Sequence, residues 1–301
     1  MNIGLIDLKH PRPNLALMKL STYHNDCGDK VHLNKLVLRT GINYISCIFD
    51  KDKQVVDKLL NKYPNSVAGG PGYDAYINLP KDVDSCKPDY SLYNINYGLG
   101  RLTSGCPNDC PWCVVPSIEG NLVHTVNTVD KLINPSSNKV VLYDSNFLSC
   151  VDAPDHLQDI IDRKLSICFD QGLDIRLVND FYANLLSKIK TESFTGRKRM
   201  FYFAWDKPEI EYHVVQGIKL LGKAGIKPYR LTFYVLCGYN TTIREDLYRV
   251  LKLKSLGVDP FVMAYDKTKP YVKDLARWCN RKQLFKSCTF KEYIKQKYSK
   301  R

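Results

Sequence analysis

Short apolar runs alternate with longer amphipathic stretches along most of the chain, a pattern typical of strands followed by helices. Near the start, the runs NIGLIDL, YISCIFD and SVAGG are separated by stretches with helical spacing, such as NLALMKLSTYHNDCG and DKQVVDKLLNKYP. In the first of these stretches Leu15, Met18 and Tyr23 fall near one helical face, and Gly28 follows as a stop signal. The alternation predicts a small doubly wound α/β domain over residues 1–80. The next stretch, LPKDVDSCKPDYSLYN, is rich in turn formers, so we expect residues 81–95 to be a linker.

Six further strand-like runs follow this linker, and helical stretches separate them. They are short and apolar with polar borders, as expected for parallel strands that are buried on both faces. Six units are fewer than the eight of a closed barrel, so residues 96–266 are predicted to form a six-stranded partial (β/α) barrel. Ligands gather at the carboxyl ends of such strands. The six runs are YGLGRLT, KVVLYD, SICFD, RMFYFAWD, LTFYVLCG and DPFVMAYD.

Composition narrows the class of protein. Hydrophobic residues make up 44% of the 301 positions and charged residues 25%, the balance of a folded protein. No run of about 18 apolar residues occurs, so no membrane partner is expected. The start MNIGLIDLKH lacks the features of a signal peptide, which favours a cytoplasmic protein. Its eleven cysteines are then expected to be reduced thiols or metal ligands.

The positive charge is concentrated at the end of the chain. Residues 267–301 contain 12 Lys and Arg against 2 Asp and Glu, or +10 of the overall +13. This segment is predicted to be a basic helical tail. Basic residues mixed with aromatic ones suit a surface that binds nucleic acid. The alternative is an amphipathic helix that closes the domain, with its aromatic side chains in the core. The aromatic residues are Tyr271, Trp278, Phe285, Phe290, Tyr293 and Tyr298.

The stretch GCPNDCPWCVVP carries the most specific chemistry, because Cys106, Cys110 and Cys113 follow the spacing C-x3-C-x2-C. A closed structural zinc site needs four ligands. Three thiolates can instead hold three irons of a cubane cluster and leave the fourth iron open for a substrate or cofactor. The loop follows the first strand of the predicted barrel, so we expect it at the ligand-binding face.

This cysteine motif, placed after the first strand of a βα repeat, resembles the radical S-adenosylmethionine (radical SAM) superfamily over residues 96–266. The resemblance implies a 4Fe–4S cluster on the three cysteines and S-adenosylmethionine (SAM) on its open iron. Reductive cleavage of SAM would give a 5′-deoxyadenosyl radical that acts on an unidentified substrate, with flavodoxin or ferredoxin as electron donor. Trp112 matches the aromatic position beside the adenine. A zinc knuckle, or a redox cluster without SAM, is the alternative.

The resemblance also implies further SAM contacts, carried over position by position. Where many members have Gly-Gly-Glu, this chain has YDSNF, so Asp144, Ser145 and Asn146 would meet the methionine amino group. Asp174 and Arg176 would bind the ribose or the SAM carboxylate. For each single residue a structural ion pair is the competing interpretation. Two more contacts complete the set: Asp206 at the ribose and Gly238 at the adenine edge.

The N-terminal domain resembles those of two radical SAM groups. One binds cobalamin, but the motif D-x-H-x-x-G that supplies its histidine ligand is absent here, so cobalamin stays an open alternative. The other group, the methylthiotransferases, holds a second cluster through three cysteines, and Cys27, Cys47 and Cys86 lie in this region. Cys47 sits within a strand, where burial is the ordinary expectation. Two other functions therefore stay open: a methyl- or methylthio-transferase on nucleic acid, and a non-catalytic iron–sulfur protein that binds nucleic acid or senses redox state.

Overall fold

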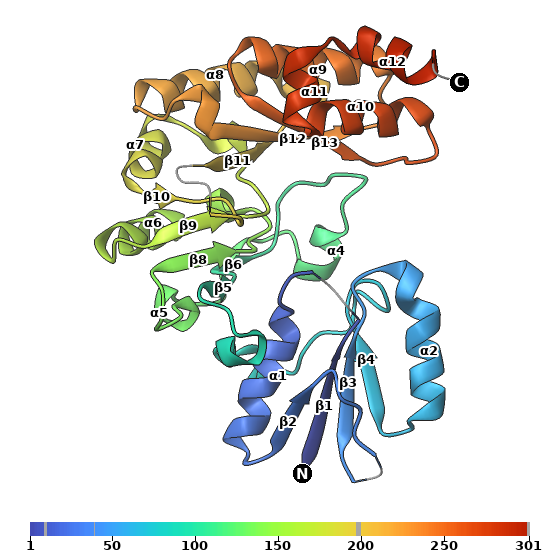
Figure 1. Cartoon of the computed structure of the whole chain (residues 1–301). Coiled ribbons are helices and arrows are strands. Elements are labelled where there is room, and N and C mark those ends of the chain that lie inside the picture. Colours follow the sequence, from blue (N-terminus) through green and yellow to red (C-terminus); the bar gives the residue numbers. More distant parts are fainter. Residues whose placement is uncertain (9–10, 39, 197–199, 300–301) are drawn as a thin grey trace. The chain divides into compact units, whose positions relative to one another are not determined.

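The computed structural model describes residues 1–8, 11–38, 40–196 and 200–299. Within these residues the fold is mixed α/β, with parallel strands and twelve α-helices (Figure 1). The chain divides into two compact units. The N-terminal unit comprises Met1–Leu102, Ser117–Glu119 and Val126–Val140, and the C-terminal unit comprises Thr103–Pro116, Gly120–Thr125 and Val141–Arg301.

The sheet of the N-terminal unit has the order β2-β1-β3-β4, and its strands pair in parallel. Ile3 of β1 is opposite Val31 of β2 and Ile42 of β3. Helices lie on both sides of the sheet (Figure 1), which confirms the predicted strand–helix alternation. The elements are β1 (Asn2–Asp7), α1 (Leu15–Asp26), β2 (Lys30–Leu33), β3 (Ile42–Ser46), α2 (Lys53–Lys62) and β4 (Ser66–Gly69).

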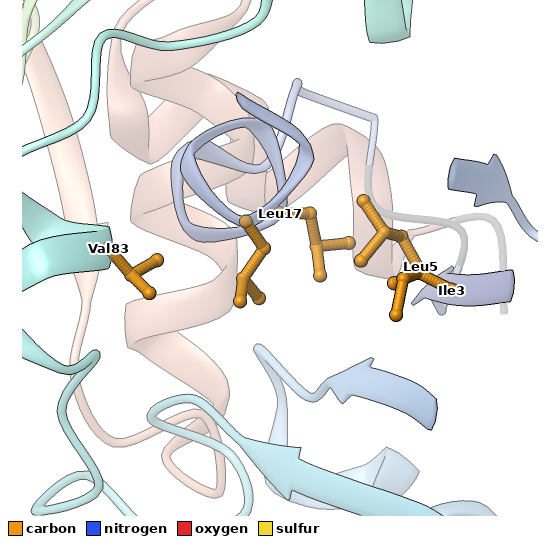
Figure 2. Close-up of a cluster of buried hydrophobic side chains, with 5 residues drawn as sticks. Ile3, Leu5, Leu17 and Val83 are labelled. Carbon is orange, nitrogen blue, oxygen red and sulfur yellow. The ribbon is translucent and has the colours of Figure 1, made fainter. Parts of the chain in front are cut away.

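Two hydrophobic clusters cover the two faces of this sheet, because successive side chains of a strand point to opposite faces. In one cluster Ile3 and Leu5 of β1 pack against Leu17 of α1 and Val83, as Figure 2 shows. The other contains Ile6, Ile45, Cys47, Val56 and Ala68. Val83 belongs to α3 (Lys81–Asp84), and a 3-10 helix follows at Tyr90–Tyr93. The segment that we expected to be a linker thus contributes a side chain to the core of this unit.

All six later runs form strands, but they do so in two sheets. One has the order β10-β9-β8-β5 and the other the order β11-β12-β13. A parallel bridge joins Leu173 and Phe203. The coarse α/β prediction is confirmed. The strands are β5 (Gly98–Gly100), β8 (Lys139–Leu142), β9 (Ser166–Phe169), β10 (Lys190–Thr191), β11 (Phe201–Ala204), β12 (Leu231–Cys237) and β13 (Asp259–Ala264).

Side chains alternate between the two faces of the β11-β12-β13 sheet. Phe203, Phe233 and Val262 are buried on one face, where α9 and α10 pack against the strands. Side chains on the opposite face, such as Phe261 and Tyr265, are exposed. We call this opposite face the open face. The helices of the unit are α6 (Ala153–Asp162), α7 (Asp180–Lys188), α8 (Glu211–Lys223), α9 (Ile243–Ser255) and α10 (Pro270–Asn280); between β5 and β8 lie α4 (Val115–Glu119) and α5 (Val129–Leu132).

The basic tail forms α10, α11 (Lys282–Ser287) and α12 (Phe290–Tyr298), while residues 300–301 lie outside the described part. Four of its six aromatic rings pack inward: the Trp278 ring centroid is 4.8 Å from that of Phe285 and 5.4 Å from that of Phe290. Trp278, Phe285, Phe290 and Tyr293 are all buried, as the amphipathic interpretation predicts. These four rings are therefore not available for stacking on bases. In the described part of the chain, no helix is long and apolar enough to cross a membrane.

Candidate cofactor site

The three-cysteine loop starts from a short antiparallel pair, in which β6 (Thr103–Ser104) is bonded to β7 (His124–Thr125). Gly105 follows with a φ of +102°, and a Cβ there would lie 2.3 Å from the carbonyl oxygen of Leu122. Only glycine satisfies both conditions. The next residue, Cys106, donates its backbone N–H to the Gly120 carbonyl at 3.0 Å. These contacts fix where the loop begins.

All three cysteines line one cavity of about 270 Å³ in the C-terminal unit. Cys106 is buried, Cys110 is partly buried and Cys113 is exposed. A backbone hydrogen bond of 2.9 Å from Cys113 N–H to the Cys110 carbonyl closes the turn between the last two. Burial raises the pKa of Cys110, while the positive charge of Lys207 acts in the opposite direction.

Nine of the eleven predicted site residues line this cavity, although they come from the separate loops that follow β6, β8, β9 and β11. They are Cys106, Cys110, Trp112, Cys113, Ser145, Asn146, Asp174, Arg176 and Asp206. Those that follow β8, β9 and β11 meet here because the carboxyl ends of parallel strands share an edge.

Asn146 connects the loop after β8 with the first cysteine. Its side-chain amide donates to Cys106 Sγ at 3.6 Å, and the residue is 3% exposed. Its Oδ1 is buried and, among the described residues, has no hydrogen-bond partner. Because an unsatisfied buried acceptor is unfavourable, this atom can accept a hydrogen bond from a bound ligand.

Asp174 and Arg176 bind each other. Arg176 donates from Nε to Asp174 Oδ1 at 2.8 Å and from Nη2 to Oδ2 at 2.5 Å. Asn108, from the cysteine loop, also donates to Asp174 at 3.2 Å. Burial opposes ionisation of Asp174, but these donors and the guanidinium charge hold its pKa below the ordinary value. The carboxylate is thus ionised and already hydrogen-bonded, and Arg176 itself lines the cavity.

Asp206 follows β11 and accepts a hydrogen bond from the backbone N–H of Leu236 at 3.1 Å. Burial raises its pKa. Arg249 and Asp246 form a buried ion pair at the ends of β11 and β12. Arg249 donates to Asp246 at 2.7 Å and to the carbonyls of Trp205 and Leu236, each at 2.7 Å. Both side chains of this pair are fully buried. The ends of β11 and β12 are therefore fixed relative to each other.

Two predicted residues do not line the cavity. Asp144 is buried and accepts hydrogen bonds from the backbone N–H and hydroxyl of Thr103, at 2.6 and 2.8 Å. It therefore braces the strand that leads into the cysteine loop. Gly238 donates its N–H to Asp246 at 3.0 Å and to the Thr241 hydroxyl at 3.2 Å. Both residues support neighbouring elements.

Sequence reasoning missed several lining residues, among them Lys207, Gln171 and Asn108. Lys207 Nζ lies 5.3 Å from the ring centroid of Trp112, a cation–π distance. Lys207 and Gln171 each come directly after an aspartate at a strand end, so strand-end position was the available signal. Asn108 lies between the first two cysteines.

Of the other three cysteines considered as ligands, Cys27 and Cys86 are close enough to interact electrostatically, whereas Cys47 lies in the hydrophobic cluster on the other face of the sheet. Cys27 is exposed at the end of α1, Cys47 is buried in the cluster that includes Val56, and Cys86 is partly buried after α3. Within the described ranges, no group of three or more His, Cys, Asp or Glu side chains could hold a metal ion. The cluster and cobalamin assignments stay predictions.

The cavity combines soft sulfur ligands, a buried amide acceptor, a guanidinium, a buried carboxyl group and an indole ring beside a cation. Thiols are ligands for soft metals by residue type, although Cys106, Cys110 and Cys113 do not form, among the described residues, a group arranged to hold an ion. A comparison of the sequence with protein-family models and with curated proteins finds no match.

Proposed function

We propose that the protein is a radical SAM enzyme whose 4Fe–4S cluster is held by Cys106, Cys110 and Cys113. The observation that carries this proposal is the cavity that all three cysteines line, together with Asn146 and Arg176. A three-cysteine motif by itself is also compatible with a zinc or redox site. The lining adds polar groups suited to a cofactor that carries both a carboxylate and an amine.

The residues present fit such a group. Thiolates are the usual ligands of iron–sulfur clusters, and hydrogen bonds to ligand sulfurs tune the cluster. Asn146 already donates such a bond to Cys106. When bound, the cluster would supply the electron that cleaves SAM, and the fragment formed would abstract a hydrogen atom from the substrate.

The chain's own residues would then bind and orient SAM. Asn146 Oδ1 can accept a hydrogen bond from an amino group, and Arg176 can donate to a carboxylate through the N–H groups that Asp174 does not use. Trp112 offers a ring face to a flat heterocycle, with Lys207 beside it. Asp206, whose pKa is raised by burial, can hydrogen-bond to a hydroxyl group.

The proposal includes the finer architecture and the partners. The two sheets would form one partial barrel, and the parallel bridge between Leu173 and Phe203 supports this continuity. A small electron-transfer protein such as flavodoxin or ferredoxin would reduce the cluster in the cytoplasm. A methyl- or methylthio-transferase would need cobalamin or a second cluster in addition. Cys27 and Cys86 lie near each other, but Cys47 is buried among aliphatic side chains, so among the described residues the three do not gather into the ligand set that a second cluster would need.

The test is anaerobic reconstitution with iron and sulfide, followed by reduction and chromatography for 5′-deoxyadenosine. We expect the product in the parent protein. In Arg176→Ala, SAM affinity should fall about tenfold or more, since a charged hydrogen bond is removed, while iron content is kept. The matched control is Arg163→Ala, which removes an arginine paired with Asp159 on the exposed face of α6.

Failure of the reconstituted parent to cleave SAM would overturn the proposal and favour the non-catalytic iron–sulfur alternative. Equal SAM affinity in Arg176→Ala and Arg163→Ala would remove Arg176 from the site and leave the cluster assignment intact.

A further inference from the structure

Three aromatic rings from separate elements meet at the edge of the cavity. Trp112 of the cysteine loop lines the cavity, and its ring centroid is 5.1 Å from that of Tyr239, with 63° between the planes. The ring of Tyr239 is in turn 4.8 Å from that of Tyr265, at 82°. Both contacts have the edge-to-face geometry that aromatic pairs prefer. We call Trp112, Tyr239 and Tyr265 the aromatic cluster.

The aromatic cluster keeps surface for a ligand. Tyr239 follows β12 and Tyr265 follows β13, so the cluster extends from the cavity to the open face. Tyr265 is 50% exposed and Tyr239 is partly exposed, although each ring already contacts another. Exposed rings grouped beside a cavity are typical of a ligand site, because a ligand covers apolar surface that water would otherwise contact.

Lys207 supplies a positive charge at the same place. Its Nζ lies 5.3 Å from the ring centroid of Trp112. Lys207 and Arg176 are the two cations that line the cavity in the described part of the chain. Arg176 pairs with Asp174, whereas no carboxylate among the described residues forms an ion pair with Lys207. Burial raises the pKa of Asp206, the neighbouring carboxyl group, which favours its neutral form. The charge of Lys207 is thus free to attract an anionic ligand.

We propose that this place binds a planar aromatic ring that carries a carboxylate, with the ring against Tyr239 and Tyr265 and the carboxylate at Lys207. The inference rests on the proposed function and names the substrate class of its site. Rings bind one another by offset stacking or edge-to-face contact, and an ammonium binds a carboxylate through charge-assisted hydrogen bonds. Arg176 is left for the carboxylate of the cofactor, so the two anions do not compete for one cation.

The combination of rings and charge selects against other classes of small molecule. An aliphatic acid would forgo the contacts with the two tyrosine rings. A neutral ring would leave the charge of Lys207 uncompensated, and a cationic ring would be repelled by it. An aromatic acid is the class that uses both features.

The experiment is isothermal titration calorimetry of the full chain with 2-naphthoate, which has a ring and a charge. The comparison probes are 2-naphthamide, which lacks the charge, and cyclohexanecarboxylate, which lacks the aromatic ring. We expect 2-naphthoate to bind about tenfold or more tightly than either. Lys207→Gln should lower its affinity about tenfold and leave that of 2-naphthamide unchanged, because only the charged hydrogen bond is lost.

Variants of the two tyrosines test the ring contacts. Tyr239→Leu with Tyr265→Leu should lower the affinity of both naphthyl probes about two- to tenfold. Tyr239→Phe with Tyr265→Phe keeps both rings and should bind like the parent. The matched controls lie on α8: Lys219→Gln at an exposed lysine, and Tyr212→Leu at a ring that is 70% exposed. Neither control should change binding.

The proposal is overturned if the parent does not bind 2-naphthoate or binds either comparison probe as tightly. It is also overturned if Lys207→Gln binds 2-naphthoate like Lys219→Gln, or if the double leucine variant binds it like the double phenylalanine variant.

A titration with saturating SAM separates the substrate from the cofactor. We expect 2-naphthoate to bind reconstituted protein with similar affinity whether or not SAM is present. Displacement of 2-naphthoate by SAM would assign Lys207 and the aromatic cluster to the cofactor and overturn the inference. If the expected probe pattern were found in a reconstituted protein that cannot cleave SAM, only the proposed function would be overturned, and the site for an aromatic acid would stand.

Discussion

Each unit of this protein contains three cysteines that could be ligands, and the two sets are arranged differently. Cys106, Cys110 and Cys113 lie on one loop and line one cavity. In the N-terminal unit, Cys47 packs among aliphatic side chains, whereas Cys27 ends α1 on the surface. Close spacing on one loop brings side chains together whatever the rest of the fold does. Cysteines from separate elements converge only if the packing of those elements requires it.

The polar residues at the strand ends differ in the same way. In the N-terminal sheet they bond to side chains outside the strands: Asn14 donates to the Ser46 hydroxyl at 2.6 Å, and the Tyr93 hydroxyl donates to Asp7 Oδ2 at 2.7 Å, while the buried Oδ1 of Asp7 has no partner among the described residues. In the C-terminal unit, Asn146, Arg176 and Asp206 line a cavity. Spare hydrogen-bonding capacity is thus present at strand ends in both units, and the C-terminal set is distinguished by the cavity that it lines.

The largest expected effect separates the two cysteine sets. Cys110→Ala should leave almost no iron after anaerobic reconstitution, because two thiolates remain where three are needed. Cys47→Ala should keep the iron content of the parent. Iron and sulfide assays with absorption spectra measure both. A full iron–sulfur cluster in Cys110→Ala would refute the assignment of the cluster to the cysteine loop. Loss of iron from a folded Cys47→Ala protein would indicate that the N-terminal unit binds it.

Thiol alkylation sharpens the contrast within the N-terminal unit. Burial, together with the negative charge of Asp52, raises the pKa of Cys47, so less of the reactive thiolate exists at any given pH. In native protein treated with iodoacetamide, mass spectrometry should find Cys27 modified and Cys47 protected. The unfolded protein, as the control, should label at both. If native Cys47 reacted as fast as Cys27, the hydrophobic side chains around Cys47 would not shield it from the reagent.

Ion pairs provide a smaller contrast between the units. Arg249→Ala leaves Asp246 and two strand-end carbonyls buried without their donor, so unfolding of the C-terminal unit should need about 3–5 kcal/mol less free energy. Lys19→Ala in the N-terminal unit removes a pair whose partner, Asp84, is 46% exposed, and should cost about 1–2 kcal/mol. Urea unfolding followed by hydrogen exchange resolves the two units. Equal losses would contradict the distinction.

The smallest expected effect concerns Asp206. Burial raises its pKa above the ordinary value of an aspartate, so the folded chain holds the proton more tightly than the unfolded chain. The stability from this carboxyl is therefore present at low pH and falls away as pH rises through the folded pKa. Asp206→Asn keeps the acceptor for Leu236 and removes the titration.

Relative to the parent, the Asp206→Asn protein should become more stable as pH rises from about 4 to 7, by about 1.4 kcal/mol for each pH unit by which burial raises the pKa. Asp180→Asn, at a side chain that is 77% exposed, is the control and should show no such trend. A flat difference between parent and Asp206→Asn across this range would mean that burial does not govern this carboxyl.

Local pattern was sufficient to predict the strands and much of the cavity. The six apolar runs became β5, β8, β9, β11, β12 and β13, because short β-rich runs between polar borders have few other stable states. Asn146 and Arg176 were named from the resemblance to the radical SAM superfamily, at positions that follow such strands. Lys207 was missed, since its place beside Trp112 depends on how the loop after β11 folds over the cysteine loop.

The sequence alone determined the alternation of strands and helices, the spacing of Cys106, Cys110 and Cys113, and the excess of cations in residues 267–301. Each of these depends on residues that are neighbours along the chain. Tertiary structure decided that Trp278 and Phe285 pack inward while Phe261 and Tyr265 stay exposed. It also decided that Asp174 pairs with Arg176 and takes up part of its hydrogen-bonding capacity. Those outcomes depend on which faces of the helices and sheets pack together. Burial and hydrogen bonds between segments that are distant in sequence determine this packing, and they form only when the whole chain has folded.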